Sequence, residues 1–109
     1  KCYACRAVCP LCYCTSCTVE CNQPQWIKLS SETEGNLEWH IMRAMHLAGR
    51  CINCGECGRN CPVGIPVHLL TIFMNQEIER DFGGKTGSSA KTGYALNTFN
   101  PEDKGDFFK

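Results

Sequence analysis

The sequence predicts a small α+β module in which a helical insertion separates two cysteine-rich segments, with little regular strand and an extended C-terminal arm. The length of 109 residues suits one small domain. Seven of the 11 cysteines lie within residues 1–21, four lie within residues 51–61, and none lies between these segments. Leu, Ile, Val and Phe together number only 22, so the fold must depend on something besides apolar burial.

The segment between the two cysteine groups predicts one helix over about residues 36–48. Asn36 suits the N-cap, and Gly49 suits the position that ends the helix. We expect Trp26 and Trp39 to be packing residues. The apolar side of this helix is predicted from five residues at helical spacing, which are Leu37, Ile41, Ala44, Met45 and Ala48.

A second helix is expected after the second cysteine segment, from about Pro66 to about Arg80. Pro66 suits the first helical turn, and Gly83-Gly84 ends the pattern. The wide apolar side of this helix predicts burial against the cysteine region or against a partner subunit. The residues of that side are Leu69, Leu70, Ile72, Phe73 and Ile78.

Strand signals are short and weak, and the best candidates are Thr18-Val19 and Trp26–Leu29. From Asp81 onward the chain is rich in Gly, Ser, Thr, Asn and Lys, which predicts a poorly packed arm. We therefore place the domain at residues 1–82 and the arm at residues 83–109. The arm has three isolated apolar anchors, Phe99, Phe107 and Phe108.

The second cysteine segment has the spacing C-x2-C-x2-C-x3-C-P, formed by Cys51, Cys54, Cys57, Cys61 and Pro62. Three thiolates on one tight loop at this spacing bind three irons of a 4Fe-4S cluster, while the fourth leaves in another direction. Gly55 and Gly58 are expected to keep the loop free of side chains that would collide with the cluster. Zinc or free thiols are the alternatives, but zinc sites usually pair two distant C-x2-C halves.

The first segment repeats the last three positions of this motif as Cys2, Cys5 and Cys9, followed by Pro10. The first cysteine of the repeat is expected three residues before Cys2, upstream of the chain given. Because the chain begins at Lys1 without Met, we expect a piece of a longer polypeptide that is cut inside its first motif.

In two-motif ferredoxins, the fourth cysteine of each motif binds the cluster of the other motif. This rule predicts one cluster on Cys51, Cys54, Cys57 and Cys9. It predicts a second cluster on Cys2, Cys5, Cys61 and the absent upstream cysteine. The crossed ligands would join both segments through iron, and without iron we expect no folding.

Four cysteines remain in the first segment, at the spacing C-x-C-x2-C-x3-C: Cys12, Cys14, Cys17 and Cys21. With the absent cysteine, the total of twelve would be enough for three clusters, so these four are candidates for a third 4Fe-4S cluster. Against this, C-x-C is tighter than the usual cluster spacing. Packing or hydrogen bonding near the other clusters is the main alternative, and a zinc site is another.

Charge and motifs exclude several other function classes. The acidic and basic residues balance at 11 each without a basic block, which removes the usual basis for binding nucleic acid. No apolar run approaches the roughly 18 residues of a membrane span, and no signal peptide is recognised. Gly84-Lys85-Thr86 lacks the first glycine of a phosphate loop, because Glu79 stands there. We expect no catalytic residue, because no nucleophilic arrangement stands out.

The remaining charged and titratable side chains near the motifs have ordinary explanations. Three histidines are expected at the surface or in capping positions: His40, His46 and His68. Four arginines lie in or beside the cysteine segments, where positive charge would raise a cluster potential or guide a docking partner. A solvated side chain is the alternative for each of them: Arg6, Arg43, Arg50 and Arg59.

The stretches from Cys2 to Cys14 and from Gly49 to Pro62 resemble the dicluster iron-sulfur electron-transfer subunits of anaerobic redox complexes. This group includes beta-type subunits of formate dehydrogenases and soluble nickel-iron hydrogenases, subunits associated with heterodisulfide reductase, and the A subunit of anaerobic sulfite reductase. The resemblance covers about residues 1–82. Cys17 and Cys21 extend beyond the pattern of most members.

The resemblance implies a ferredoxin-like dicluster module in a cytoplasmic subunit of a larger complex. Such a subunit passes single electrons between a catalytic subunit and a flavin-containing or ferredoxin partner. Two other functions stay open, a catalytic cluster whose open iron binds substrate and a redox sensor whose cluster loss is the signal. The direction of electron flow depends on cluster potentials, which the sequence does not fix.

Overall fold

The structure is a computed structural model that describes residues 2–28, 31–91, 93–103 and 105. Two long helices, two single-turn helices and two 3-10 turns make up its framework. Their bounds are α1 Ala4–Ala7, η1 Thr18–Glu20, α2 Thr33–Leu47, α3 Glu56–Arg59, α4 His68–Phe82 and η2 Ala95–Asn97. In this described part, no helix has both the length and the apolar character needed to cross a membrane.

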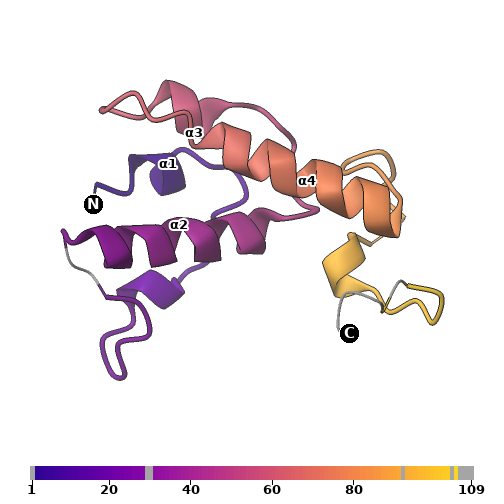
Figure 1. Ribbon diagram of the computed structural model, residues 1–109, viewed down its shortest axis with the longest axis horizontal. Coiled ribbons are helices and arrows are strands. Elements are labelled where there is room, and N and C mark those ends of the chain that lie inside the picture. Colours follow the sequence, from indigo (N-terminus) through magenta and orange to yellow (C-terminus); the bar gives the residue numbers. More distant parts are fainter. Residues whose placement is uncertain (1, 29–30, 92, 104, 106–109) are drawn as a thin grey trace.

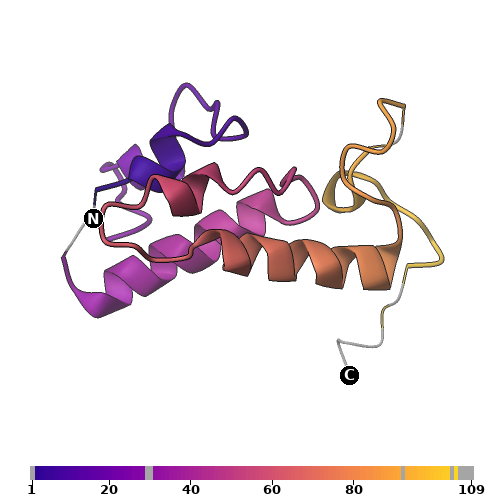
Figure 2. The ribbon, with the colours of Figure 1, turned by 90° about the horizontal axis from the view of Figure 1, so that it is seen from above.

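The short helices of the two cysteine segments lie side by side and are supported by the long helices (Figure 1). Helix α1 contacts α3, α3 contacts α4, and α2 runs beside α4, as the turned view in Figure 2 also shows. The buried core lies between the cysteine segments and α2. It consists of Cys5, Val19, Ile27, Trp39 and Cys57. Two of these five residues, Cys5 and Cys57, are predicted iron ligands, so the core and the predicted metal site share side chains.

The two predicted strands are wrong, and no strand is present among residues 2–28, 31–91, 93–103 and 105. Thr18 and Val19 belong to η1, where Glu20 N–H donates to the Cys17 carbonyl at 2.8 Å. Residues 26–28 are irregular, and Leu29 lies outside the described residues. Such short segments have no partner strand with which to form a ladder. The described fold is therefore helical, where the sequence predicted α+β.

Helix α2 confirms the predicted insertion but begins one turn earlier than expected. Its N-cap is Glu32, so the prediction of Asn36 as the N-cap is wrong. The Asn36 side chain instead donates to the Glu32 carbonyl at 2.9 Å. Gly49 ends the helix as predicted, with φ of +68°, a left-handed conformation that suits glycine.

The buried side of α2 is not the predicted apolar side. Trp39, Arg43 and Leu47 face inward at intervals of four residues. Of the predicted side, Ala44 and Ala48 are buried, but three residues are exposed, namely Leu37, Ile41 and Met45. Trp39 is a packing residue, as expected, and contacts the Tyr3 ring at 5.0 Å. Trp26 is 65% exposed, so its predicted packing role is wrong.

Helix α4 confirms the second predicted helix, displaced by two residues. Gly83 follows it with φ of +69°. The inward residues are polar, because Thr71 and Asn75 are buried. Much of the predicted apolar side is exposed, including Leu69, Leu70 and Phe73. The expected burial of this side against the cysteine region is therefore wrong for these three residues.

The arm after α4 makes few contacts through its aromatic residues. Phe99 is 90% exposed and anchors nothing, while Phe107 and Phe108 lie outside the described residues. Tyr94 instead lies against the guanidinium of Arg50, at 5.3 Å from its ring centre. The arm thus returns to the start of the second cysteine segment.

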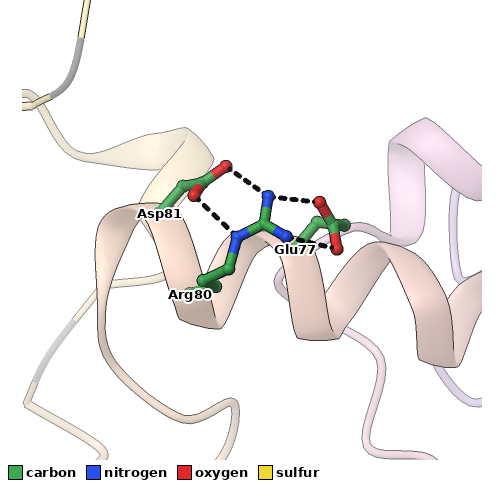
Figure 3. Close-up of polar contacts among 3 residues, drawn as sticks. All are labelled: Glu77, Arg80 and Asp81. Carbon is green, nitrogen blue, oxygen red and sulfur yellow. Dashed lines mark hydrogen bonds and ion pairs between the residues drawn. The ribbon is translucent and has the colours of Figure 1, made fainter.

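The C-terminal end of α4 carries an ion-paired cluster on the surface. Arg80 donates to both carboxylate oxygens of Glu77 and of Asp81 (Figure 3). The Arg80 side chain is 62% exposed, so solvent screens these pairs and their contribution to stability is small. This end of the helix therefore carries an exposed, ion-paired arginine.

Candidate iron-sulfur centre

The two cysteine segments repeat one backbone structure. Each short helix follows a residue with left-handed φ, which is Tyr3 at 56° before α1 and Gly55 at 76° before α3. Each helix holds one buried cysteine in its middle, Cys5 at 7% exposure and Cys57 at 8%. The single turn directs these two cysteines into the core. The internal repeat seen in the sequence is therefore also a repeat of conformation.

Matching backbone hydrogen bonds close the two repeats. Cys9 N–H donates to the Arg6 carbonyl at 3.2 Å, and Cys61 N–H donates to the Gly58 carbonyl at 3.2 Å. The chain makes a further turn after each of these cysteines. In the first repeat a backbone N–H donates to the Cys9 carbonyl, and in the second another donates to the Cys61 carbonyl, each at 3.1 Å. The last cysteine of each motif is thus held at the same point of the same turn.

One cavity is lined by cysteines from both segments. Its walls include all four residues predicted to bind the first cluster, which are Cys9, Cys51, Cys54 and Cys57. Cys51 and Cys54 come from the loop that leads into α3, Cys57 comes from α3 itself, and Cys9 comes from the segment after α1. The structure therefore brings together residues separated by more than forty positions, as crossed ligation requires.

The three residues predicted for the second cluster have different surroundings. Cys5 is buried, Cys2 is exposed, and Cys61 is half-buried. Burial raises the pKa of the Cys5 thiol, the Arg43 charge counteracts this rise, and Cys57 and Cys2 add to it. Cys5 therefore lies within electrostatic reach of one cysteine from each predicted cluster.

Backbone N–H groups already donate to two of the predicted ligand sulfurs. Asn53 N–H donates to Cys51 Sγ at 3.4 Å, and Ile65 N–H donates to Cys61 Sγ at 3.3 Å. Asn53 adopts a left-handed φ of 57°, which turns its N–H back toward the preceding cysteine. Hydrogen bonds to cysteine sulfur are one of the factors that set the potential of an iron-sulfur cluster.

Asn75 on α4 holds the start of the second segment, and sequence reasoning missed it. Its Oδ1 accepts from Gly49 N–H at 3.0 Å, and its Nδ2 donates to the Cys51 carbonyl at 2.6 Å and to Asn53 Oδ1 at 3.2 Å. The residue is only 7% exposed. In the sequence, the only sign of this role is that an asparagine stands within an apolar stretch.

The structure gives the glycines of the second segment further reasons to be glycine, and the predicted clearance for a cluster stays a prediction. Gly55 needs its left-handed φ, and a Cβ there would lie 3.0 Å from Arg59 Nη1. A Cβ on Gly58 would lie 2.1 Å from His68 Nδ1. A side chain at position 58 would therefore collide with His68.

The histidines differ in their surroundings. His46 is exposed, as predicted, and His40 packs on the Trp39 ring at 4.6 Å. His68 opens α4 and lines the cavity of the first predicted cluster. Its Nδ1 is buried and has no hydrogen-bond partner among the described atoms. The expectation of a surface or capping role is therefore wrong for His68.

Arg43 is the buried member of the four arginines. It is 7% exposed, and its Nη2 donates to the Cys5 carbonyl at 3.1 Å. The other three bind surface groups: Arg6 pairs with Glu20, Arg59 with Glu56, and Arg50 donates to Tyr13 Oη. Burial lowers the pKa of Arg43, but nearby thiolates, with Cys5 and Cys12 foremost, outweigh this and raise the pKa.

The four additional cysteines are only partly gathered. A second cavity is lined by Cys12, Cys14 and Cys17, whereas Cys21 directs its thiol to the Cys17 carbonyl at 3.7 Å. Burial, followed by the charge of Cys9, raises the pKa of Cys12 to about 11. Among the described residues, no three His, Cys, Asp or Glu side chains converge on a point for a single metal ion.

The sequence of the chain is similar to that of a known protein. Over 84 residues the chain is 36% identical to the F420-dependent formate dehydrogenase subunit beta of Methanocaldococcus jannaschii. The chain resembles a formate dehydrogenase beta subunit. The match covers 76% of this chain and 21% of that protein, so the chain spans about a fifth of the curated relative's length. No protein-family model matches the chain. The similarity supports the formate dehydrogenase type among the groups that the cysteine motifs resemble.

Proposed function

We propose that the chain is an electron-transfer module that holds two 4Fe-4S clusters within an anaerobic oxidoreductase complex. The observation that carries this proposal is the cavity lined by Cys9, Cys51, Cys54 and Cys57. It draws cysteines from both motifs, which is the pattern of two-cluster ferredoxins. The second cluster is assigned to Cys2, Cys5, Cys61 and a fourth ligand outside these 109 residues.

The residues around the cavity suit an anionic cluster of iron and thiolate. Cys9, Cys51, Cys54 and Cys57 supply the soft ligands that such clusters prefer. Backbone N–H groups point at ligand sulfur, and the buried charge of Arg43 faces the same cavity. When bound, a 4Fe-4S cluster accepts and releases one electron at a time. The role of the chain in this proposal is to supply the four thiolate ligands from its two cysteine segments.

We assign the partners by analogy with the curated relative, which is a formate dehydrogenase subunit. The module would pass electrons between a catalytic subunit of formate dehydrogenase, hydrogenase or heterodisulfide reductase type and a flavin-containing or ferredoxin partner. Exposed apolar side chains support a partner subunit. They include Leu37, Ile41 and Met45 on α2 and Leu69, Leu70 and Phe73 on α4. We place the module in the cytoplasm, as the resemblance to the dicluster subunits of anaerobic redox complexes implies.

We also consider a third cluster, and the second cavity is the observation that supports it. Cys12, Cys14 and Cys17 line it together, which favours a common ligand over three independent packing thiols. Cys21 would have to turn away from the Cys17 carbonyl to complete the set. Iron content separates this arrangement from a two-cluster module.

Metal and sulfide analysis of anaerobically purified protein tests the proposed function. The chain is best expressed with any coding sequence upstream of Lys1. We expect about eight irons and eight sulfides per chain, together with reversible one-electron reduction. About twelve irons would establish the third cluster. Zinc with little iron, or iron that cannot be reduced and reoxidised, would contradict an electron-transfer role.

A further inference from the structure

Arg43 is a buried cation without a carboxylate partner. In the described part of the chain no ion pair is formed by Arg43, and its Nε is buried without any hydrogen-bond partner. Its Nη2 donates to the neutral carbonyl of Cys5 at 3.1 Å. An uncompensated charge in a protein interior costs several kcal/mol. The fold therefore requires a negative group beside this guanidinium.

Cysteine sulfurs, which become negative when they bind iron, are the groups that the structure places there. Arg43 lines the cavity of Cys9, Cys51, Cys54 and Cys57, and it also lines the neighbouring cavity of Cys12. Its position results from α2, because Trp39 and Leu47 on the same side of the helix are buried with it. The helix thus carries one fixed charge into the space between the two cysteine segments.

We propose that Arg43 is the counter-charge of the cluster held by Cys9, Cys51, Cys54 and Cys57, and that it raises the reduction potential of that cluster. This inference rests on the proposed function. Reduction adds one negative charge to the cluster, and a fixed positive charge at low dielectric stabilises the reduced form more than the oxidised form. Arg43 is not a ligand, and it influences the cluster through its charge at the wall of the cavity. It is therefore a positioning residue.

The test measures both reduction potentials by redox titration under EPR, after iron and sulfide content have been determined. Arg43→Met removes the charge and keeps most of the volume. We expect at least a tenfold fall in the ratio of reduced to oxidised cluster at fixed potential for one cluster. For one electron this corresponds to about 59 mV toward more negative values. Arg43→Lys keeps the charge and should shift the ratio much less.

Arg80→Met is the matched control, since Arg80 is 62% exposed at the far end of α4 (Figure 3). We expect wild-type potentials for this variant. The proposal fails if Arg43→Met shifts neither potential beyond the control, or if Arg43→Lys shifts it equally. Should Arg43→Met bind no iron, normal loading of Arg43→Lys supports the need for charge, and loss of iron in both contradicts it. A wild-type protein without reducible iron would instead refute the proposed function.

Discussion

At the scale of single residues, the second cysteine segment depends on a side chain that contains no sulfur. Asn75 satisfies the N–H that follows the end of α2 and the carbonyl of the first ligand of the motif. The residue is 7% exposed; its hydrogen bond from Gly49 N–H is buried, and the two that its Nδ2 donates are partly buried. Asn75 therefore fixes the position at which the chain leaves α2 and enters the cysteine loop.

Asn75→Leu is expected to destabilise the iron-loaded protein. The substitution leaves Gly49 N–H and the Cys51 carbonyl without partners, at a cost of about 1–3 kcal/mol for each buried group. The rate of iron loss to a chelator should rise accordingly. Gln76→Leu, at the exposed neighbouring position, is the control and should leave that rate unchanged. Equal rates for Asn75→Leu and wild type would show that the amide does not hold the loop.

Gly58 and His68 are expected to be coupled. A Cβ at position 58 would lie 2.1 Å from His68 Nδ1, so Gly58→Ala should displace α4 from the motif and lower iron content. His68→Ala removes the obstructing ring. In a double-mutant cycle, the second substitution should restore most of the iron that the first one loses. Additive losses would show that Gly58 is needed for backbone conformation or cluster space instead.

The limits of sequence reasoning are clearest for these residues. Cys9 and Cys51 could be assigned from spacing alone, because ligand geometry imposes a fixed pattern on the chain. Asn75 and Arg43 could not, because a buried polar residue is defined by tertiary contacts that no local pattern records. Arg43 was one of four arginines near the motifs, and only the packing of α2 separates it from the other three, which are less buried.

At the scale of elements, both long helices were predictable and their buried sides were not. Helical spacing and the glycines after each helix suffice to place α2 and α4 within a few residues. The buried side of α2 carries Trp39 and Arg43, because the cysteine segments pack there. A prediction from apolar periodicity assumes that the buried side of a helix packs against apolar residues. Here the buried side of α2 packs against the cysteine loops.

Substitution of each of the two tryptophans tests which side of α2 is buried. Trp39→Ala should destabilise the loaded protein by about 3–5 kcal/mol, because the 4% exposed ring packs on Tyr3. Trp26→Ala should change the free energy of unfolding by less than about 0.5 kcal/mol, since Trp26 is 65% exposed. Denaturant midpoints followed by circular dichroism provide the comparison. Equal midpoints for the two variants would contradict the observed packing.

At the scale of the whole molecule, the fold is two cysteine repeats supported by two helices. The core is small and includes Cys5 and Cys57, so iron binding and folding are expected to be one process. The repeat relation was visible in the sequence, and the predicted crossed ligation required the two segments to meet, which they do through the contact of α1 with α3. That contact brings Cys9 to the second motif and makes crossed ligation the central claim about this molecule.

Redox titration of three single serine variants tests that claim most directly. If ligation is crossed, Cys9→Ser and Cys57→Ser alter or abolish the same one of the two reduction potentials. Cys5→Ser then alters the other potential, although Cys5 and Cys9 belong to the same motif. The contradictory result is that Cys9→Ser and Cys5→Ser affect one potential and Cys57→Ser the other, because each motif would then hold its own cluster.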